Sequence, residues 1–248
     1  MLLKKNAFKT ALQEMRLQRG IWCTLSDPLA AEMTAGCGYD WMLFDTEHSP
    51  TGIHNILPLL QAVAPYMVSP IVRPAVLEPA LIKKYLDFGA QTILVPYVQT
   101  PEEAALAVAS VTYPPEGIRG VAGMTRATGF GTIAGYHEKA RDEICILVQI
   151  ETVQAVERME EIAATPGLDG IFIGPADLAA SMGYPGQPSH PEVKRAVVDH
   201  IRRIRALGLP PGVLAVDLSL AQDCIDAGAV FVSQDLDLIA LRKGLSLT

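Results

Sequence analysis

Eight short apolar runs alternate with helix-like segments along almost the whole chain, and this alternation limits the folds that the sequence can adopt. The runs are rich in β-branched residues, which favours buried strands, and the segments between them carry apolar residues at helical spacing. We expect strands over 20–26, 39–48, 70–74, 91–98, 144–151, 169–175, 212–217 and 230–235. Such alternation indicates a parallel sheet covered by helices.

Eight strand–helix units favour a closed (β/α)8 barrel, the TIM barrel, over an open doubly wound sheet. The chain has 248 residues, and one such barrel usually needs about 250. No GxGxxG follows the first strand, which argues against a dinucleotide-binding sheet. We therefore expect an α/β protein with a single barrel domain over 1–248. The pattern of residues 6–18 predicts an N-terminal helix that caps one end of the barrel.

Composition excludes several classes of protein. Half of the residues are hydrophobic and 19% are charged, which favours a large core. The net charge is −7 and no basic stripe occurs, so we expect no nucleic-acid partner. The N-terminus is polar where a signal peptide needs an apolar run, and no 18-residue apolar stretch occurs. We expect a soluble cytoplasmic protein without membrane contact, whose four scattered cysteines are buried free thiols.

One segment breaks the alternation. Residues 112–141 are rich in glycine and contain Arg119 and Arg126. A connection of this length is rarely a plain loop, so we expect it to have a functional or interfacial role.

Charged and polar side chains stand where the expected strands end. They are Asp45, Glu47 and His48 after the second strand, Arg73 after the third, Gln149 and Glu151 after the fifth, and Asp177 just beyond the sixth. Barrel active sites lie at the carboxyl ends of the strands, so these groups should converge. Each also has a structural interpretation, because a strand-end acid can cap a helix and an arginine can pair with a barrel acid.

The residue types predict metal-assisted carbonyl chemistry. Glu151 and Asp177 are candidate ligands for Mg²⁺ or Mn²⁺, which prefer oxygen donors. His48 could be a third ligand, but it suits a general base better. Arg73 cannot lose its proton and suits stabilising an oxyanion or binding a carboxylate.

Two further features refine this prediction. A helix begins after the Gly174–Pro175 turn, and the free N–H groups near Ala176 and Asp177 could hold a substrate carboxylate. A catalytic imine needs a lysine in a desolvated pocket. None of the lysines stands in an expected strand or at its end, so a metal route is preferred.

The runs YDWMLFDTEHSP, PIVRP, TYPPEGIRGV, ILVQIET and IFIGPADLAASMGYPGQPSHPEV resemble the HpcH/HpaI aldolase family of metal-dependent pyruvate aldolases. The resemblance extends from Gly20 to about Asp235, with the motifs in order and at barrel spacing. It implies a class II aldolase, a carbon–carbon lyase of aromatic or sugar acid catabolism. Such an enzyme cleaves a 4-hydroxy-2-oxo acid reversibly to pyruvate or hydroxypyruvate and an aldehyde. It also implies Mg²⁺ or Mn²⁺, with Co²⁺ as a further option, and a homohexamer built as a trimer of dimers.

The resemblance also implies residue roles. The metal ligands fall on Glu151 and Asp177, the base on His48, the enolate-stabilising arginine on Arg73, and the pyruvyl-binding groups on Gln149 and on Gly174, Ala176 and Asp177. The acid that raises the basicity of the histidine falls on Asp87. The residues alone favour Asp45, which stands three positions from His48. We keep both acids, with Asp87 first. Asp87 should lie on the wrong face within its own subunit and could serve a neighbouring one.

Two departures from the family pattern concern specificity and assembly. The stretch GMTRATGFG carries less bulk after Arg126 than many family members do, and this loop helps to shape the aldehyde pocket. The chain ends soon after the eighth strand, which leaves little room for a long exchanged C-terminal helix. The alternative functions are a citramalyl-CoA- or malyl-CoA-type lyase, which usually has more chain after the barrel, and a non-catalytic barrel that binds metal and 2-oxo acid.

Overall fold

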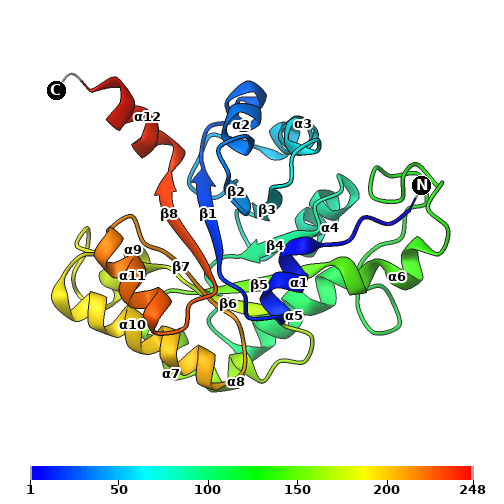
Figure 1. The fold of residues 1–248 in the computed structure, drawn as a ribbon. Helices are drawn as coiled ribbons and strands as arrows, with labels where there is room; N and C mark the ends of the chain where they lie inside the picture. Colours follow the sequence, from blue (N-terminus) through cyan, green and yellow to red (C-terminus); the bar gives the residue numbers. More distant parts are fainter. Residues whose placement is uncertain (1, 247–248) are drawn as a thin grey trace.

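The computed structural model describes residues 2–246 and forms a closed barrel of eight parallel strands (Figure 1). Neighbours in the barrel are neighbours in the chain, and β1 pairs with β8 to close it. The (β/α)8 prediction is therefore confirmed. The strands are β1 Gln18–Cys23, β2 Trp41–Asp45, β3 Ser69–Arg73, β4 Thr92–Val95, β5 Cys145–Ile150, β6 Gly170–Ile173, β7 Pro211–Leu214 and β8 Phe231–Leu236.

The helices surround the strands, and several start as the sequence indicates. The side chains of Asp27, Thr100 and Asp217 each accept a backbone N–H of the helix that follows. The helices are α1 Ala7–Gln13, α2 Pro28–Ala35, α3 Ile53–Val63, α4 Pro79–Asp87, α5 Pro101–Val111, α6 Tyr136–Glu143, α7 Val153–Glu157, α8 Met159–Ala163, α9 Pro175–Ser181, α10 Pro191–Ala206, α11 Leu218–Asp226 and α12 Asp237–Leu245.

Several expected boundaries differ from the structure by up to three residues, as at β1, β4 and β7, and two of the differences have a local cause. The single helix expected over 152–164 is divided into α7 and α8, because Arg158 leaves the helical region with φ −104° and ψ 15°. The second strand was expected to reach residue 48 but ends at Asp45. There the Asp45 carboxylate accepts the backbone N–H of Glu47 at 2.9 Å, which turns the chain out of the strand.

The core has two layers. One apolar cluster lies between the strands and the outer helices, and the other fills the barrel interior. Helix α1 closes the N-terminal end of the interior, where the Phe8 ring packs edge-on against Trp41 and Phe231. The expected capping helix is therefore present, although it is shorter than residues 6–18. Its aromatic contacts leave no space for a ligand to pass through the barrel.

The insertion lies on the N-terminal face. It follows α5, which runs back from the end of β4, and it precedes β5, so topology alone puts it there. Its last part forms α6, which the sequence did not predict. On the opposite side, α12 extends away from the end of β8 (Figure 1). Leu238, Leu241 and Leu245 are exposed along this helix.

Two composition-based expectations can be compared with the described residues. Cys23, Cys145 and Cys224 are buried free thiols as expected, but Cys37 is exposed just beyond the end of α2. Within residues 2–246, no helix is both long and apolar enough to cross a membrane.

The interior packing predicts a cost for filling Gly20. A Cβ at this position would lie 2.1 Å from the ring of Trp41, which is fully buried and cannot move aside. We expect Gly20→Ala to lower the free energy of unfolding by about 1–3 kcal/mol. Gly123→Ala is the matched control, because a Cβ there meets nothing within 4 Å. Urea unfolding followed by circular dichroism measures both. Equal stability of the two variants would contradict this packing.

Candidate active site

Arg73, the last residue of β3, is the most constrained polar side chain at the C-terminal face. Asp45 lies beside it in register at the end of β2. Its carboxylate accepts from Nε at 2.8 Å and from Nη2 at 2.6 Å. The guanidinium also lies over the Trp22 ring, 4.7 Å from its centroid, and the Trp22 indole donates to Asp45. This bidentate and stacked arrangement fixes the position of the cation.

Burial and pairing act in opposite directions on Asp45. Burial alone would raise the pKa of this carboxyl group, but the hydrogen bonds and charge of Arg73 outweigh it and hold the pKa below its ordinary value. Asp45 is therefore ionised when it binds Arg73. The sequence suggested that Asp45 tunes His48. In the structure Asp45 contacts the His48 backbone N–H at 3.4 Å, and its oxygens are shared among Arg73, Trp22 and the Glu47 backbone.

His48 and Glu47 occupy the turn after β2. The His48 side chain is 67% exposed, and its Nε2 lies 3.9 Å from Glu47 Oε1. The other Glu47 oxygen, Oε2, lies 2.8 Å from Arg73 Nη1. The sequence places Glu47 among the charged residues that follow the second expected strand, but it predicts no individual role for this residue. Its position between the guanidinium and the imidazole comes from the turn, which the sequence pattern did not predict.

Glu151 follows β5 and is buried, with 2% of its surface exposed. Its Oε1 accepts the backbone N–H of Tyr97 at 2.9 Å, and its Oε2 accepts from the Gln149 side-chain amide. Burial is the largest cause that raises the pKa of Glu151 to about 8, and the charges of Asp177 and Glu47 add to it. Tyr97 adopts a left-handed backbone conformation with φ 53°. No sequence signal predicted this conformation, which costs energy in a residue with a side chain.

Gly174 has no side chain, and the side chains of Glu151 and Gln149 lie in the space where its Cβ would be. A Cβ here would lie 2.3 Å from Glu151 Oε2 and 2.6 Å from Gln149 Nε2, so no other residue fits without displacing them. Gln149 Oε1 is buried without a hydrogen-bond partner among the described residues. Ala176 and Asp177 follow in the first turn of α9 and are exposed. Glu151, Gln149 and Gly174 therefore form one cradle at the ends of β5 and β6.

The donor set fits a divalent cation held by few protein ligands. Among residues 2–246 no group of three or more His, Cys, Asp or Glu side chains is arranged to hold a metal ion. Glu151 and Asp177 could supply two carboxylates, and burial followed by the charges of Asp177 and Glu47 raises the pKa of Glu151. Mg²⁺ and Mn²⁺ suit such a site, since Mg²⁺ usually keeps several waters and takes only one or two carboxylates.

Asp87 lies on the other face of the barrel. It ends α4, close to where β4 begins, and its carboxylate lies 3.4 Å from Nη2 of the buried Arg119. Arg119 stacks on Tyr113 and belongs to the insertion. Arg126, the second arginine of the insertion, donates to the Phe88 backbone carbonyl. Within one chain the structure therefore groups Asp87 with the insertion arginines and not with His48.

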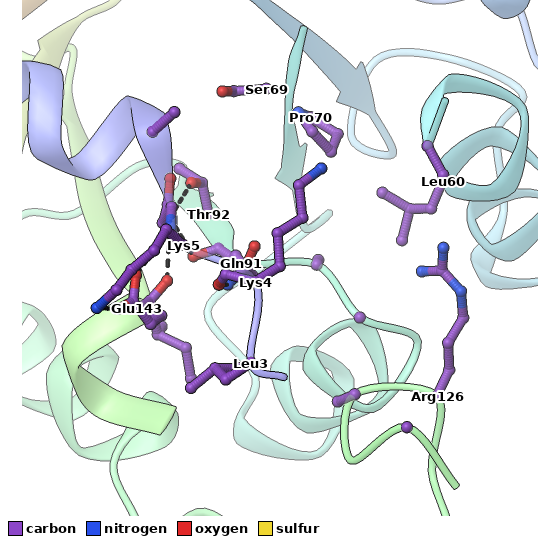
Figure 2. Close-up of a pocket in the computed structure, with 18 of the residues that line it drawn as sticks. Leu3, Lys4, Lys5, Leu60, Ser69, Pro70, Gln91, Thr92, Arg126 and Glu143 are labelled. Carbon is purple, nitrogen blue, oxygen red and sulfur yellow. Dashed lines mark hydrogen bonds and ion pairs between the residues drawn. The ribbon is translucent and has the colours of Figure 1, made fainter. Parts of the chain in front are cut away.

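A cavity of about 620 Å³ lies on this N-terminal face (Figure 2). It is lined by the N-terminal segment, the end of α3 and the insertion, and Figure 2 shows Leu60 and Arg126 across from Lys5 and Glu143. It contains none of the groups gathered at the C-terminal face. This cavity and the candidate active site are thus at opposite ends of the barrel.

The raised pKa of Glu151 makes the stability of the metal-free protein depend on pH. The folded-state pKa is about 8 and the ordinary value is 4.5. The stabilisation from the bound proton is complete below the ordinary value and is lost as the pH rises through the folded-state pKa. Glu151→Gln cannot ionise, and Gln149 can turn its amide to pair with the new side chain. With EDTA present, we expect this variant to become increasingly more stable than the wild type between about pH 5 and pH 8.

Urea unfolding at several pH values measures the difference, which corresponds to about 1.4 kcal/mol per unit of pKa shift. Added Mg²⁺ should stabilise the wild type and remove the advantage of the variant. If the two proteins show the same pH dependence without metal, Glu151 ionises in the folded state as it does in water.

Comparison with known proteins agrees with this geometry. The family described as HpcH/HpaI aldolase/citrate lyase matches residues 18–243. The chain is 56% identical over 240 residues to a hydroxypyruvate/pyruvate aldolase of Sagittula stellata, covering 97% of this chain and 95% of that protein. It is 47% identical to a 4-hydroxy-2-oxo-heptane-1,7-dioate aldolase of Salmonella heidelberg, covering 97% and 92%.

Among solved structures, an HpcH/HpaI aldolase/citrate lyase family protein from Burkholderia cenocepacia J2315 has a TM-score of 0.92 at 37% identity, with 97% of this chain and 98% of that chain covered. The conclusion from the barrel, the strand-end groups and these relatives is that the chain belongs to the HpcH/HpaI aldolase/citrate lyase family.

Proposed function

We propose that this protein is a divalent-metal-dependent aldolase that cleaves a 4-hydroxy-2-oxo acid reversibly into pyruvate, or hydroxypyruvate, and an aldehyde. The observation that carries the proposal is the fixed Arg73 guanidinium at the same barrel mouth as the buried Glu151. Relatives that are 47–56% identical over almost the whole chain are named as aldolases. The citrate lyase β-subunit structure with a TM-score of 0.59 is only 16% identical and indicates the fold alone, so an acyl-CoA lyase is not favoured.

Glu151 and Asp177 would hold the cation, Mg²⁺ or Mn²⁺ with Co²⁺ as an option. When bound, the cation polarises the 2-oxo group and favours negative charge on its oxygen. Gln149 and the backbone at Gly174, Ala176 and Asp177 would orient the pyruvyl part of the substrate. Gln149 Oε1 lacks a protein partner, and the missing Cβ at Gly174 keeps the approach open.

His48 acts on the proton that must leave before the carbon–carbon bond breaks. It takes the proton of the C4 hydroxyl group, and the electrons of that O–H bond form the aldehyde carbonyl. The C3–C4 bond pair forms the C2=C3 double bond while the π pair of the C2 carbonyl moves to its oxygen, which gives an enolate. Arg73 stabilises this oxygen with the N–H groups that Asp45 leaves free, and a proton returned to C3 completes pyruvate. One such preorganised donor is commonly worth about 3–4 kcal/mol.

Asp87 can act on His48 only across subunits, because it lies at the other end of its own barrel. We include in the proposal a homo-oligomer, a hexamer built as a trimer of dimers, in which one copy brings Asp87 to the mouth of another. The carboxylate is partly accessible beside Arg119, which supports this role.

The metal ligands can be tested by removing one charge at a time. We expect wild-type protein with Mg²⁺ or Mn²⁺ to release pyruvate from several 4-hydroxy-2-oxo acids, and EDTA to stop it. Glu151→Gln and Asp177→Asn should lose the metal-dependent activity while the circular dichroism spectrum stays that of the wild type. Borohydride added with pyruvate should leave the protein mass unchanged. Full activity in EDTA, or a reduced pyruvyl adduct, would refute the metal route.

Arg73 and His48 should fail differently when each is replaced by alanine. Arg73 acts on the enolate oxygen, which forms both in cleavage and in exchange of the pyruvate methyl protons. Arg73→Ala should therefore slow both reactions, by about 10²–10³-fold for a lost oxyanion donor. His48→Ala should lose cleavage but keep part of the exchange, since solvent can supply the proton. NMR of pyruvate in D₂O follows exchange. Equal losses in both variants would mean that the two residues act as one unit.

A further inference from the structure

Glu47 is a charged group at the barrel mouth that the proposed mechanism leaves unused. Its side chain is 19% exposed and lies between two groups of the mechanism. Oε2 is 2.8 Å from Arg73 Nη1, and Oε1 is 3.9 Å from His48 Nε2. Asp45, by contrast, binds the Nε and Nη2 side of the same guanidinium. The two acids therefore contact different nitrogens of Arg73.

The backbone fixes Glu47 in this place. Asp45 Oδ1 accepts the N–H of Glu47 at 2.9 Å and that of His48 at 3.4 Å, and the Ser49 hydroxyl donates to the Asp45 carbonyl. The turn thus depends on the same carboxylate that holds Arg73. Because the turn sets which way successive side chains point, Glu47 faces the arginine while His48 faces solvent.

The charge of Glu47 exceeds what Arg73 needs for neutrality. Asp45 already pairs the guanidinium with two aligned hydrogen bonds. Burial is the largest influence on the pKa of Glu47 and raises it. The positive charge of Arg73 and the charge of His48 lower this pKa, whereas the negative charges of Asp45 and Asp177 raise it further. Its buried Oε2 has no aligned hydrogen bond despite the short contact with Nη1. A second, imperfectly paired and partly buried carboxylate costs stability, and such costs concentrate at functional sites.

We infer that Glu47 is a positioning residue, which holds the Nη1 end of Arg73 toward the oxygen of the bound 2-oxo acid. Asp45 binds the Nε and Nη2 edge of the guanidinium and the Trp22 ring lies against its face, but neither of them binds the Nη1 atom. The charge of Glu47 restrains the other end, so the unpaired N–H groups keep one direction. This inference rests on the proposed function of Arg73 as the group that stabilises the enolate oxygen.

The test is a double-mutant cycle on Glu47 and Arg73. Oxalate is the probe, because it is a planar dianion that resembles the enolate of a 2-oxo acid. Its binding with Mg²⁺ is measured by calorimetry, and pyruvate release is measured in parallel. We expect Glu47→Gln to weaken oxalate binding and to lower kcat by about 10–100-fold, the usual range for a residue that orients another. KM and Mn²⁺ affinity should change little.

In an Arg73→Lys background the Nη1 atom is absent, so Glu47→Gln should then have little further effect. Glu102→Gln is the matched control, because Glu102 is an exposed acid at the start of α5 whose nearest cation is Arg158. It should bind oxalate and cleave substrate as the wild type does. Glu47→Asp should recover part of the loss, since it restores the charge with a shorter reach.

The outcomes separate the two proposals. If the effects of Glu47→Gln and Arg73→Lys simply add, Glu47 does not act through Arg73 and the inference is overturned. If the wild type binds oxalate but cleaves no 4-hydroxy-2-oxo acid, the proposed function fails while the cycle on binding still decides the role of Glu47. If the wild type binds no oxalate, both proposals fail.

Discussion

The paired carboxylate and guanidinium at the ends of β2 and β3 organise the mouth of this barrel. Asp45 and Arg73 are opposite each other in the strand register, so the ion pair forms wherever these strands pair correctly. The same carboxylate ends β2, turns the chain, and receives the Trp22 indole that lies under the cation. One buried interaction thereby positions a cation, an aromatic ring and the turn that carries Glu47 and His48.

Negative charge exceeds positive charge in this region, and the excess has a structural consequence. Glu47 contacts a cation whose charge Asp45 already matches, and the charges of Asp177 and Glu47 add to the burial that raises the pKa of Glu151. A site selected for stability alone would not gather these acids, because buried like charges oppose folding. The strained Tyr97 backbone, which presents its N–H to Glu151, belongs to the same pattern. This arrangement gives up stability, as the proposed cation and 2-oxo acid site would require.

The architecture could be predicted from the sequence because each strand carries its own signal. Apolar runs of strand length predict the strands, and capping residues such as Thr100 predict where the helices begin. Eight such strand–helix units then indicate a barrel. Topology then places Arg73 and Glu151 at one face without any knowledge of contacts. Asp87 was expected on the other face for the same reason, since it ends a helix that leads into a strand.

Features that depend on tertiary contacts could not be predicted in this way. Sequence proximity suggested that Asp45 raises the basicity of His48, but the strand register places Asp45 beside Arg73. The polar helix α6 lacks an apolar stripe and forms where the glycine-rich insertion returns to the barrel. The left-handed Tyr97 and the contact of Glu47 with Arg73 depend on two loops meeting, and no pattern within either loop reports that.

The residues of the proposed mechanism follow or end β2, β3, β5 and β6, and none of them comes from β7 or β8. The loop after β7 instead holds Asp217, which caps α11 and pairs with Lys194, and the exposed Leu218. Two of the eight strand ends can thus change their shape and polarity by mutation while the residues of the proposed mechanism stay in place. Substitutions at these strand ends can therefore change which aldehyde is accepted, one residue at a time, and each intermediate protein keeps its activity.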